Sequence, residues 1–146
     1  MGRRRQAREI ALQALYIVDT SNTPQEEAFK IVNRREQPDD EKTLEFAQEL
    51  VIGTMKERAA LDKHIEQTAE NWALSRMAAV DRNVLRMAAY ELLHRLETPV
   101  NVVIDEAIEI VRKFSTEEST RFVNGILDKI KALRSNDHGR REEPES

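Results

Sequence analysis

Hydrophobic residues recur every three or four positions along most of the chain, which is the spacing of α-helices. A run of apolar residues at 100–104 could also form a strand, but that strand would have no partner. The pattern therefore predicts six or seven helices and no sheet, which is an all-α fold. The predicted helices cover approximately residues 3–19, 24–35, 40–54, 76–96, 100–114 and 118–133. Between the third and the next of these, a fourth helix or a kinked extension of the third reaches about residue 71, and a break is expected at about residues 71–75.

Prolines and capping residues set the boundaries of these helices. The prolines, each at a point where the helical pattern starts or stops, are Pro24, Pro38, Pro99 and Pro144. Thr23 is expected to cap the second helix, one of the two aspartates after Pro38 the third, and residues 115–118 form a further cap signature. Gly53 lies inside the third helix, where glycine costs roughly 1 kcal/mol relative to alanine. A close helix crossing would explain it.

The composition describes a folded protein without thiol chemistry. Hydrophobic residues make up 40% of the 146 positions, which is enough for one domain or two small subdomains. The absence of cysteine excludes thiol catalysis, zinc fingers and iron–sulfur clusters, and suits a reducing compartment. We expect no secretory signal, because the start of the chain lacks the apolar core of one, and we expect no membrane span, because no apolar run is long enough. We expect a cytoplasmic protein that needs no cofactor.

The charge is unevenly distributed along the chain. The net charge is −4, yet Arg3, Arg4, Arg5 and Arg8 lie within the first eight residues. The rest of the chain is therefore more acidic than the net charge indicates. A basic arm of this kind can bind phosphates, and an acidic body can receive a basic protein partner. The alternative is a solvated N-terminus without a ligand.

Catalytic and metal-binding patterns are weak. Glu91 and His94 have the Glu-x-x-His spacing of di-iron helical bundles, but a second copy of this motif is missing. Asp105 and Glu109 are one helical turn apart, and a pair of acids on one face is most simply surface charge. No histidine lies beside an obvious serine nucleophile. The pattern favours neither an enzyme nor a metal site.

Aromatic and basic residues alternate towards the C-terminus. Lys113, Arg121 and Lys129 lie near Phe114 and Phe122 in the sequence. A phenylalanine beside an arginine can stack on an unpaired base while the arginine holds its phosphate. Both phenylalanines also fit apolar helical stripes, so packing in the core is the competing interpretation.

Several short motifs are spread along the chain in a fixed order. They are RRRQAR at 3–8, QALY at 13–16, DR at 81–82, LRMA at 85–88, YEL at 90–92, Pro99, IDEA at 104–107 and FVNGIL at 122–127. Together they resemble the motifs of the NusB family of bacterial transcription antitermination factors. The resemblance extends over about residues 3–133, and its one clear departure is Asp105, where the family often has asparagine.

The resemblance implies two three-helix subdomains packed across each other. We expect an N-terminal subdomain with the arginine arm at residues 1–75, a C-terminal subdomain at 76–134, and a disordered polar tail at 135–146. A related module begins some ribosomal RNA cytosine methyltransferases, but this chain has neither room for their catalytic domain nor a cysteine nucleophile.

The resemblance also implies the function and partners of the chain. It implies binding of the single-stranded boxA element of RNA together with ribosomal protein NusE, within the antitermination complex of RNA polymerase. A homodimer is possible, and a helical scaffold without RNA is the alternative. The RNA-binding residues implied by the resemblance are Arg3, Arg4, Arg5, Arg8 and the helix start from Glu118 to Phe122. The pattern of aromatic and basic residues adds Lys113, Arg121 and Lys129 to the expected RNA-binding residues. Tyr16 and Asp81 are implied to face NusE.

Overall fold

The computed structural model describes residues 2–70 and 72–142, with side chains up to residue 134. The described residues form seven α-helices, one short 3-10 helix and no strand, which confirms the all-α class. The elements are α1 (Gly2–Ser21), α2 (Gln25–Glu36), α3 (Glu41–Lys56), α4 (Arg58–Thr68), η1 (Leu74–Arg76), α5 (Ala79–His94), α6 (Val100–Phe114) and α7 (Glu117–Glu142).

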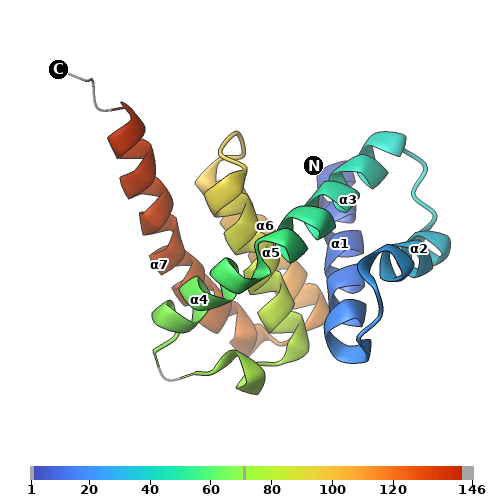
Figure 1. Ribbon diagram of the computed structural model, residues 1–146, viewed down its shortest axis with the longest axis horizontal. Helices are drawn as coiled ribbons and strands as arrows, with labels where there is room; N and C mark the ends of the chain where they lie inside the picture. The colour runs from blue at the N-terminus through green and yellow to red at the C-terminus, as the bar shows by residue number, and fades with distance from the viewer. Residues whose placement is uncertain (1, 71, 143–146) are drawn as a thin grey trace.

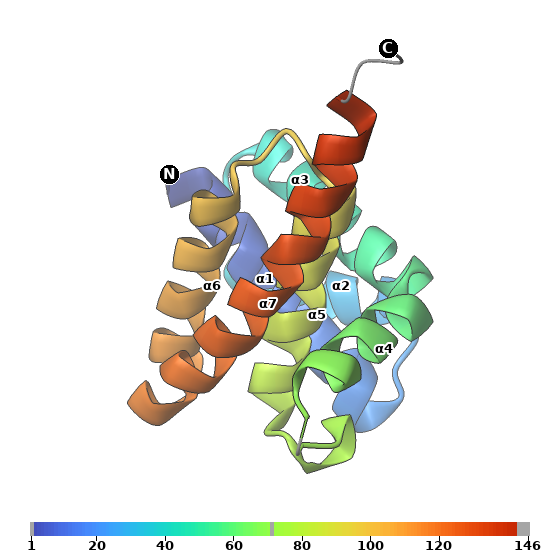
Figure 2. The ribbon, with the colours of Figure 1, turned by 90° about the vertical axis from the view of Figure 1, so that its left-hand side faces the viewer.

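The helices form two groups that share one hydrophobic core. α1 packs against α2 and α3, while α5 packs against α6 and α7. α5 lies in the middle of the molecule and also contacts α1 and α3, which joins the two groups (Figures 1 and 2). α4 packs mainly on α5 and α7, although the sequence predicts that residues up to 75 belong to the first group. α4 therefore follows α3 in the chain but lies with the second group.

The helix boundaries follow local capping chemistry in two of the three predicted places. The Asp40 carboxylate accepts a hydrogen bond from the Lys42 backbone N–H at 3.2 Å, at the start of α3. The Thr116 hydroxyl accepts one from the Ser119 backbone N–H at 3.0 Å, at the start of α7. The predicted cap by Thr23 is wrong, because Pro24 occupies the capping position of α2 and no side chain caps that helix.

Three other predicted segments differ in how well they agree with the structure. Residues 100–104 belong to α6, so the strand alternative is wrong. The break between α4 and α5 falls where the sequence predicts it, although residue 71 lies outside the described residues. α7 continues as a helix past residue 135 to Glu142, and the last part of the predicted tail, residues 143–146, lies outside the described residues.

Gly53 lies where α3 crosses α5. A Cβ atom at this position would collide with the ring of Tyr90. The absence of a side chain therefore lets the two helices approach, as the sequence predicts. No helix among the described residues is long and apolar enough to cross a membrane.

Candidate nucleic-acid interface

The first turn of α1 presents two arginines to solvent and holds them against α3. Arg3 and Arg4 are exposed. The Arg4 guanidinium lies 4.0 Å from the centre of the Phe46 ring, which is a cation–π contact. Arg3 forms an ion pair with Asp40 at 3.3 Å. These contacts fix the arm on the helical body while leaving both side chains accessible.

Arg5 is half-buried and joins α1 to α6. Its Nε and Nη2 atoms donate to the two carboxylate oxygens of Glu106 at 2.9 and 2.8 Å. These hydrogen bonds hold the pKa of Glu106 below its ordinary value, although burial opposes the shift. The bidentate geometry leaves Arg5 less free to bind a phosphate than Arg3 or Arg4.

Arg8 does not belong to the exposed arm. Its side chain is only 3% exposed, and it donates two hydrogen bonds to the buried carboxylate of Glu91, at 2.8 and 2.9 Å. The expected contact between Arg8 and RNA does not fit this geometry, because the guanidinium is both covered and paired. The same pair occupies Glu91, the acid of the Glu-x-x-His motif. The described residues contain no cluster of potential metal ligands.

The start of α7 carries the second predicted RNA-binding segment. Glu118 and Arg121 are exposed, and Phe122 is partly buried against the core. Ser119 donates a hydrogen bond to the Asp81 carboxylate at 2.7 Å, which fixes this end of α7 on the first turn of α5. Asp81 itself is 5% exposed, and it lies where α5 meets α7, at the wall of a hollow between these two helix starts.

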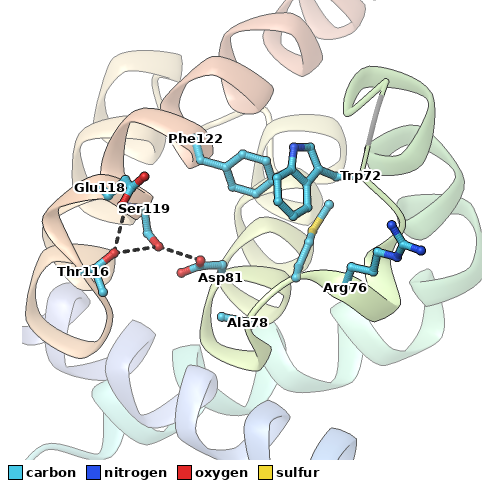
Figure 3. Close-up of a pocket in the computed structure, with 9 residues that line it drawn as sticks. Trp72, Arg76, Ala78, Asp81, Thr116, Glu118, Ser119 and Phe122 are labelled. Carbon is cyan, nitrogen blue, oxygen red and sulfur yellow. Dashed lines mark hydrogen bonds between the residues drawn. The ribbon is translucent and has the colours of Figure 1, made fainter.

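Trp72 is a surface residue that the sequence analysis did not select. It is 52% exposed and meets the Phe122 ring edge to face, with ring centres 5.9 Å apart (Figure 3). Both side chains line a hollow of about 240 Å³. The sequence does contain a clue to this exposure: the only tryptophan of the chain lies in the polar break between two predicted helices.

The two predicted lysines and Phe114 do not line the hollow beside Trp72. Lys113 forms an ion pair with Glu9 at 3.0 Å and lies 5.3 Å from the centre of the Phe114 ring. Lys129 is exposed and its ammonium lies 3.5 Å from the Thr68 carbonyl oxygen. The structure does not bring Phe114 and Phe122 into one cavity: Phe122 lines the hollow beside Trp72, and Phe114 lines a different one.

A second, mainly apolar hollow contains Tyr16. This hollow, of about 320 Å³, is formed by α1, α2, α5 and α6. Tyr16 is 40% exposed there, and Arg35 reaches the same region through a hydrogen bond to Gln13. Its lining residues are Leu12, Gln13, Tyr16, Ile17, Arg35, Val80 and Phe114. An exposed aromatic residue in an apolar hollow is a common centre of a protein–protein contact.

The fold and these surfaces define a small all-helical protein with a cationic helix end and separate aromatic hollows. The family profile described as "NusB family" matches residues 5–132. The chain belongs to the NusB family, which confirms the resemblance seen in its motifs.

Similar proteins agree with this assignment. The transcription antitermination protein NusB of Elusimicrobium minutum is 50% identical, over 93% of this chain and 98% of that protein. The structure of T. maritima NusB matches with a TM-score of 0.81 and 38% identity, over 88% of this chain and 90% of that one. A crystal structure of antitermination factors NusB and NusE in complex with dsRNA matches with a TM-score of 0.83 and 28% identity, over 91% and 98%.

Proposed function

We propose that this chain is a transcription antitermination factor that binds RNA together with ribosomal protein NusE. The relatives carry the antitermination name, and one similar protein has been crystallised with NusE and RNA. The observation that carries the proposal is the pair Arg3 and Arg4, exposed at a fixed helix end of an otherwise acidic protein. Such a pair attracts phosphates locally, while the acidic body repels polyanions that bind without specificity.

The proposal also specifies which RNA the chain binds and which complex it joins. The RNA is the single-stranded boxA element, and the complex acts with RNA polymerase during transcription in the cytoplasm. Arg3 and Arg4 form one contact to the RNA, and the α7 start with Glu118, Arg121 and Phe122 forms another. The role of the chain is to bind and to assemble, without a catalytic step.

The apolar hollow around Tyr16 is the proposed contact with NusE. The aromatic side chain is exposed, and the hollow is large enough to take a side chain of a partner protein. Asp81 belongs less well to this contact than the resemblance implies, because its carboxylate is buried and bonded to Ser119. The acidic body as a whole supplies the attraction for a basic ribosomal protein.

The double variant Arg3→Ala, Arg4→Ala tests RNA binding directly. It should weaken binding to boxA RNA without unfolding the chain, because both side chains are exposed. If each arginine contacts one phosphate, the slope of log K against log salt should fall by roughly 1.4, since each contact to a single strand contributes about 0.7. The measurement is fluorescence anisotropy of labelled boxA RNA at several salt concentrations, with NusE present and absent.

The matched control is Lys56→Ala, Lys63→Ala, which removes the same number of positive charges from exposed positions on α3 and α4. It should change the affinity and the slope much less than the arginine variant. If the slope of log K against log salt is equal for the wild type and the arginine variant, Arg3 and Arg4 do not contact the RNA. That result would favour a scaffold that does not bind RNA.

A further inference from the structure

We propose that the hollow beside Trp72 holds one unpaired RNA base, with Trp72 as the stacking surface and Asp81 selecting bases that carry an amino group. The proposal rests on the proposed RNA-binding function and adds a base-specific site to it. The hollow lies between η1 and the starts of α5 and α7 (Figure 3). The side chains that line it include Trp72, Arg76, Asp81, Ser119 and Phe122.

Trp72 has the properties of a preformed stacking surface. About half of this large apolar side chain is exposed. Trp72 lies in the segment between α4 and η1, outside the described helices. The edge-to-face contact with Phe122, at an interplanar angle of 69°, supports the indole from one side. A base that stacks on an indole already held in place loses less conformational entropy on binding than one that must order it.

Asp81 supplies an unsatisfied acceptor in the same hollow. One carboxylate oxygen accepts the hydrogen bond from Ser119, whereas the other, Oδ1, is buried without a hydrogen-bond partner. A buried acceptor without a donor costs free energy, so a ligand that supplies the donor gains affinity. The hollow thus combines an aromatic pair with a carboxylate oxygen that lacks a donor, and both features suit a nucleobase.

The chemistry of the carboxylate predicts which bases fit. An ionised carboxylate only accepts hydrogen bonds, and the exocyclic amino groups of cytosine, adenine and guanine donate them. Uracil has no amino group, and carbonyl oxygens flank its single ring N–H, so it would bring acceptors towards the carboxylate. Arg76 is exposed at the edge of the hollow, where it can pair with the phosphate of the bound nucleotide.

The fluorescence of Trp72 reports on this site without a label, because the chain has no other tryptophan. Titration with boxA RNA should quench this fluorescence over the same concentration range in which anisotropy shows binding. Trp72→Leu should weaken binding about 5-fold to 150-fold, the range measured for the loss of one stacked base. Trp72→Phe should retain most of the affinity, because it keeps an aromatic face.

Two further variants separate stacking from packing. Phe122→Leu keeps most of the apolar volume and should weaken RNA binding while it melts near the wild-type temperature. Ile52→Ala is the control for loss of an exposed apolar side chain, since Ile52 lies on α3 and is 48% exposed, close to the 52% of Trp72. It should leave both the affinity and the melting temperature unchanged. Normal binding by both Trp72→Leu and Phe122→Leu would overturn the proposal.

Base selection is tested with short RNAs of equal length made only of C, A or U. The C and A oligonucleotides should quench Trp72 fluorescence at lower concentrations than the U oligonucleotide. Asp81→Asn keeps an acceptor for Ser119 and adds an amide donor, so it should remove most of the preference. Equal binding of all three RNAs by the wild type would overturn the role of Asp81.

These results are distinguishable from failure of the proposed function. RNA binding that depends on Arg3 and Arg4 but leaves Trp72 fluorescence unchanged would overturn the base site and keep the RNA-binding function. No RNA binding under any condition would overturn both.

Discussion

At the scale of single residues, two glycines in helices have opposite surroundings. A Cβ atom on Gly53 would collide with the Tyr90 ring, whereas a Cβ atom on Gly125 would meet nothing within 4 Å. Tyr90 in turn stacks on His94, with ring centres 5.5 Å apart. Gly53 is therefore required by helix packing, and nothing within the described chain requires Gly125.

Alanine at these two positions should have opposite effects on stability. Gly53→Ala forces the Tyr90 ring aside, and overpacking of this kind costs about 1–3 kcal/mol. Gly125→Ala serves as the control and should stabilise the chain by up to about 1 kcal/mol through helix propensity alone. The measurement is urea unfolding followed by circular dichroism. A stabilised Gly53→Ala variant would show that the α3–α5 crossing tolerates a side chain.

At the scale of elements, α1 is fastened to the C-terminal helices by two bidentate ion pairs. Arg8 binds Glu91 on α5, and Arg5 binds Glu106 on α6. Both acids also lie close together in space, since Arg8 approaches Glu106 to 4.0 Å. The arginine motif at the start of the chain thus has two tasks: its first two arginines face solvent and the next two connect helices.

Disruption of the Arg8–Glu91 pair should lower the stability of the chain, because this pair connects α1 to α5. Arg8→Met leaves the Glu91 carboxylate buried without its partner, and changes of this kind cost about 3–5 kcal/mol. The double variant Arg8→Met, Glu91→Leu removes both charges and should recover most of the lost stability. The free energies of unfolding of the single and double variants decide between the two outcomes. A double variant as unstable as Arg8→Met would mean that the packing of Arg8, rather than its charge, holds α1 in place.

At the scale of the whole molecule, α1 serves two proposed surfaces with its two ends. Arg3 and Arg4 lie at its start, and Tyr16 lies near its end in the apolar hollow. The contacts of α1 with α2, α3 and α5 make it a rigid connection between them. RNA and a partner protein can therefore bind to one helix without competing for the same side chains.

Tyr16→Asp should separate partner binding from RNA binding. A charge in the apolar hollow should weaken association with NusE by roughly 30-fold, the effect of losing one central interface residue. The affinity for boxA RNA alone and its salt slope should remain unchanged. Isothermal titration calorimetry measures the affinity for NusE, and fluorescence anisotropy measures the affinity for boxA RNA and its salt slope. Ile31→Asp, at a similarly exposed position on α2, is the control. Normal NusE binding by Tyr16→Asp would place the partner on another surface.

Local patterns in the sequence were enough to predict the helices of this protein, a cap by one of the two aspartates after Pro38, a cap within residues 115–118, and the family resemblance. Helical periodicity and capping depend on neighbours within a few residues, so they can be recognised without a fold. The burial of Arg8 could be seen only in the folded chain, because its partner Glu91 lies 83 positions away. The same holds for the packing of α4 on α5 and α7, and for the contact between Trp72 and Phe122. Whether a charged or aromatic residue faces solvent depends on which distant helix covers it, and local patterns do not contain that information.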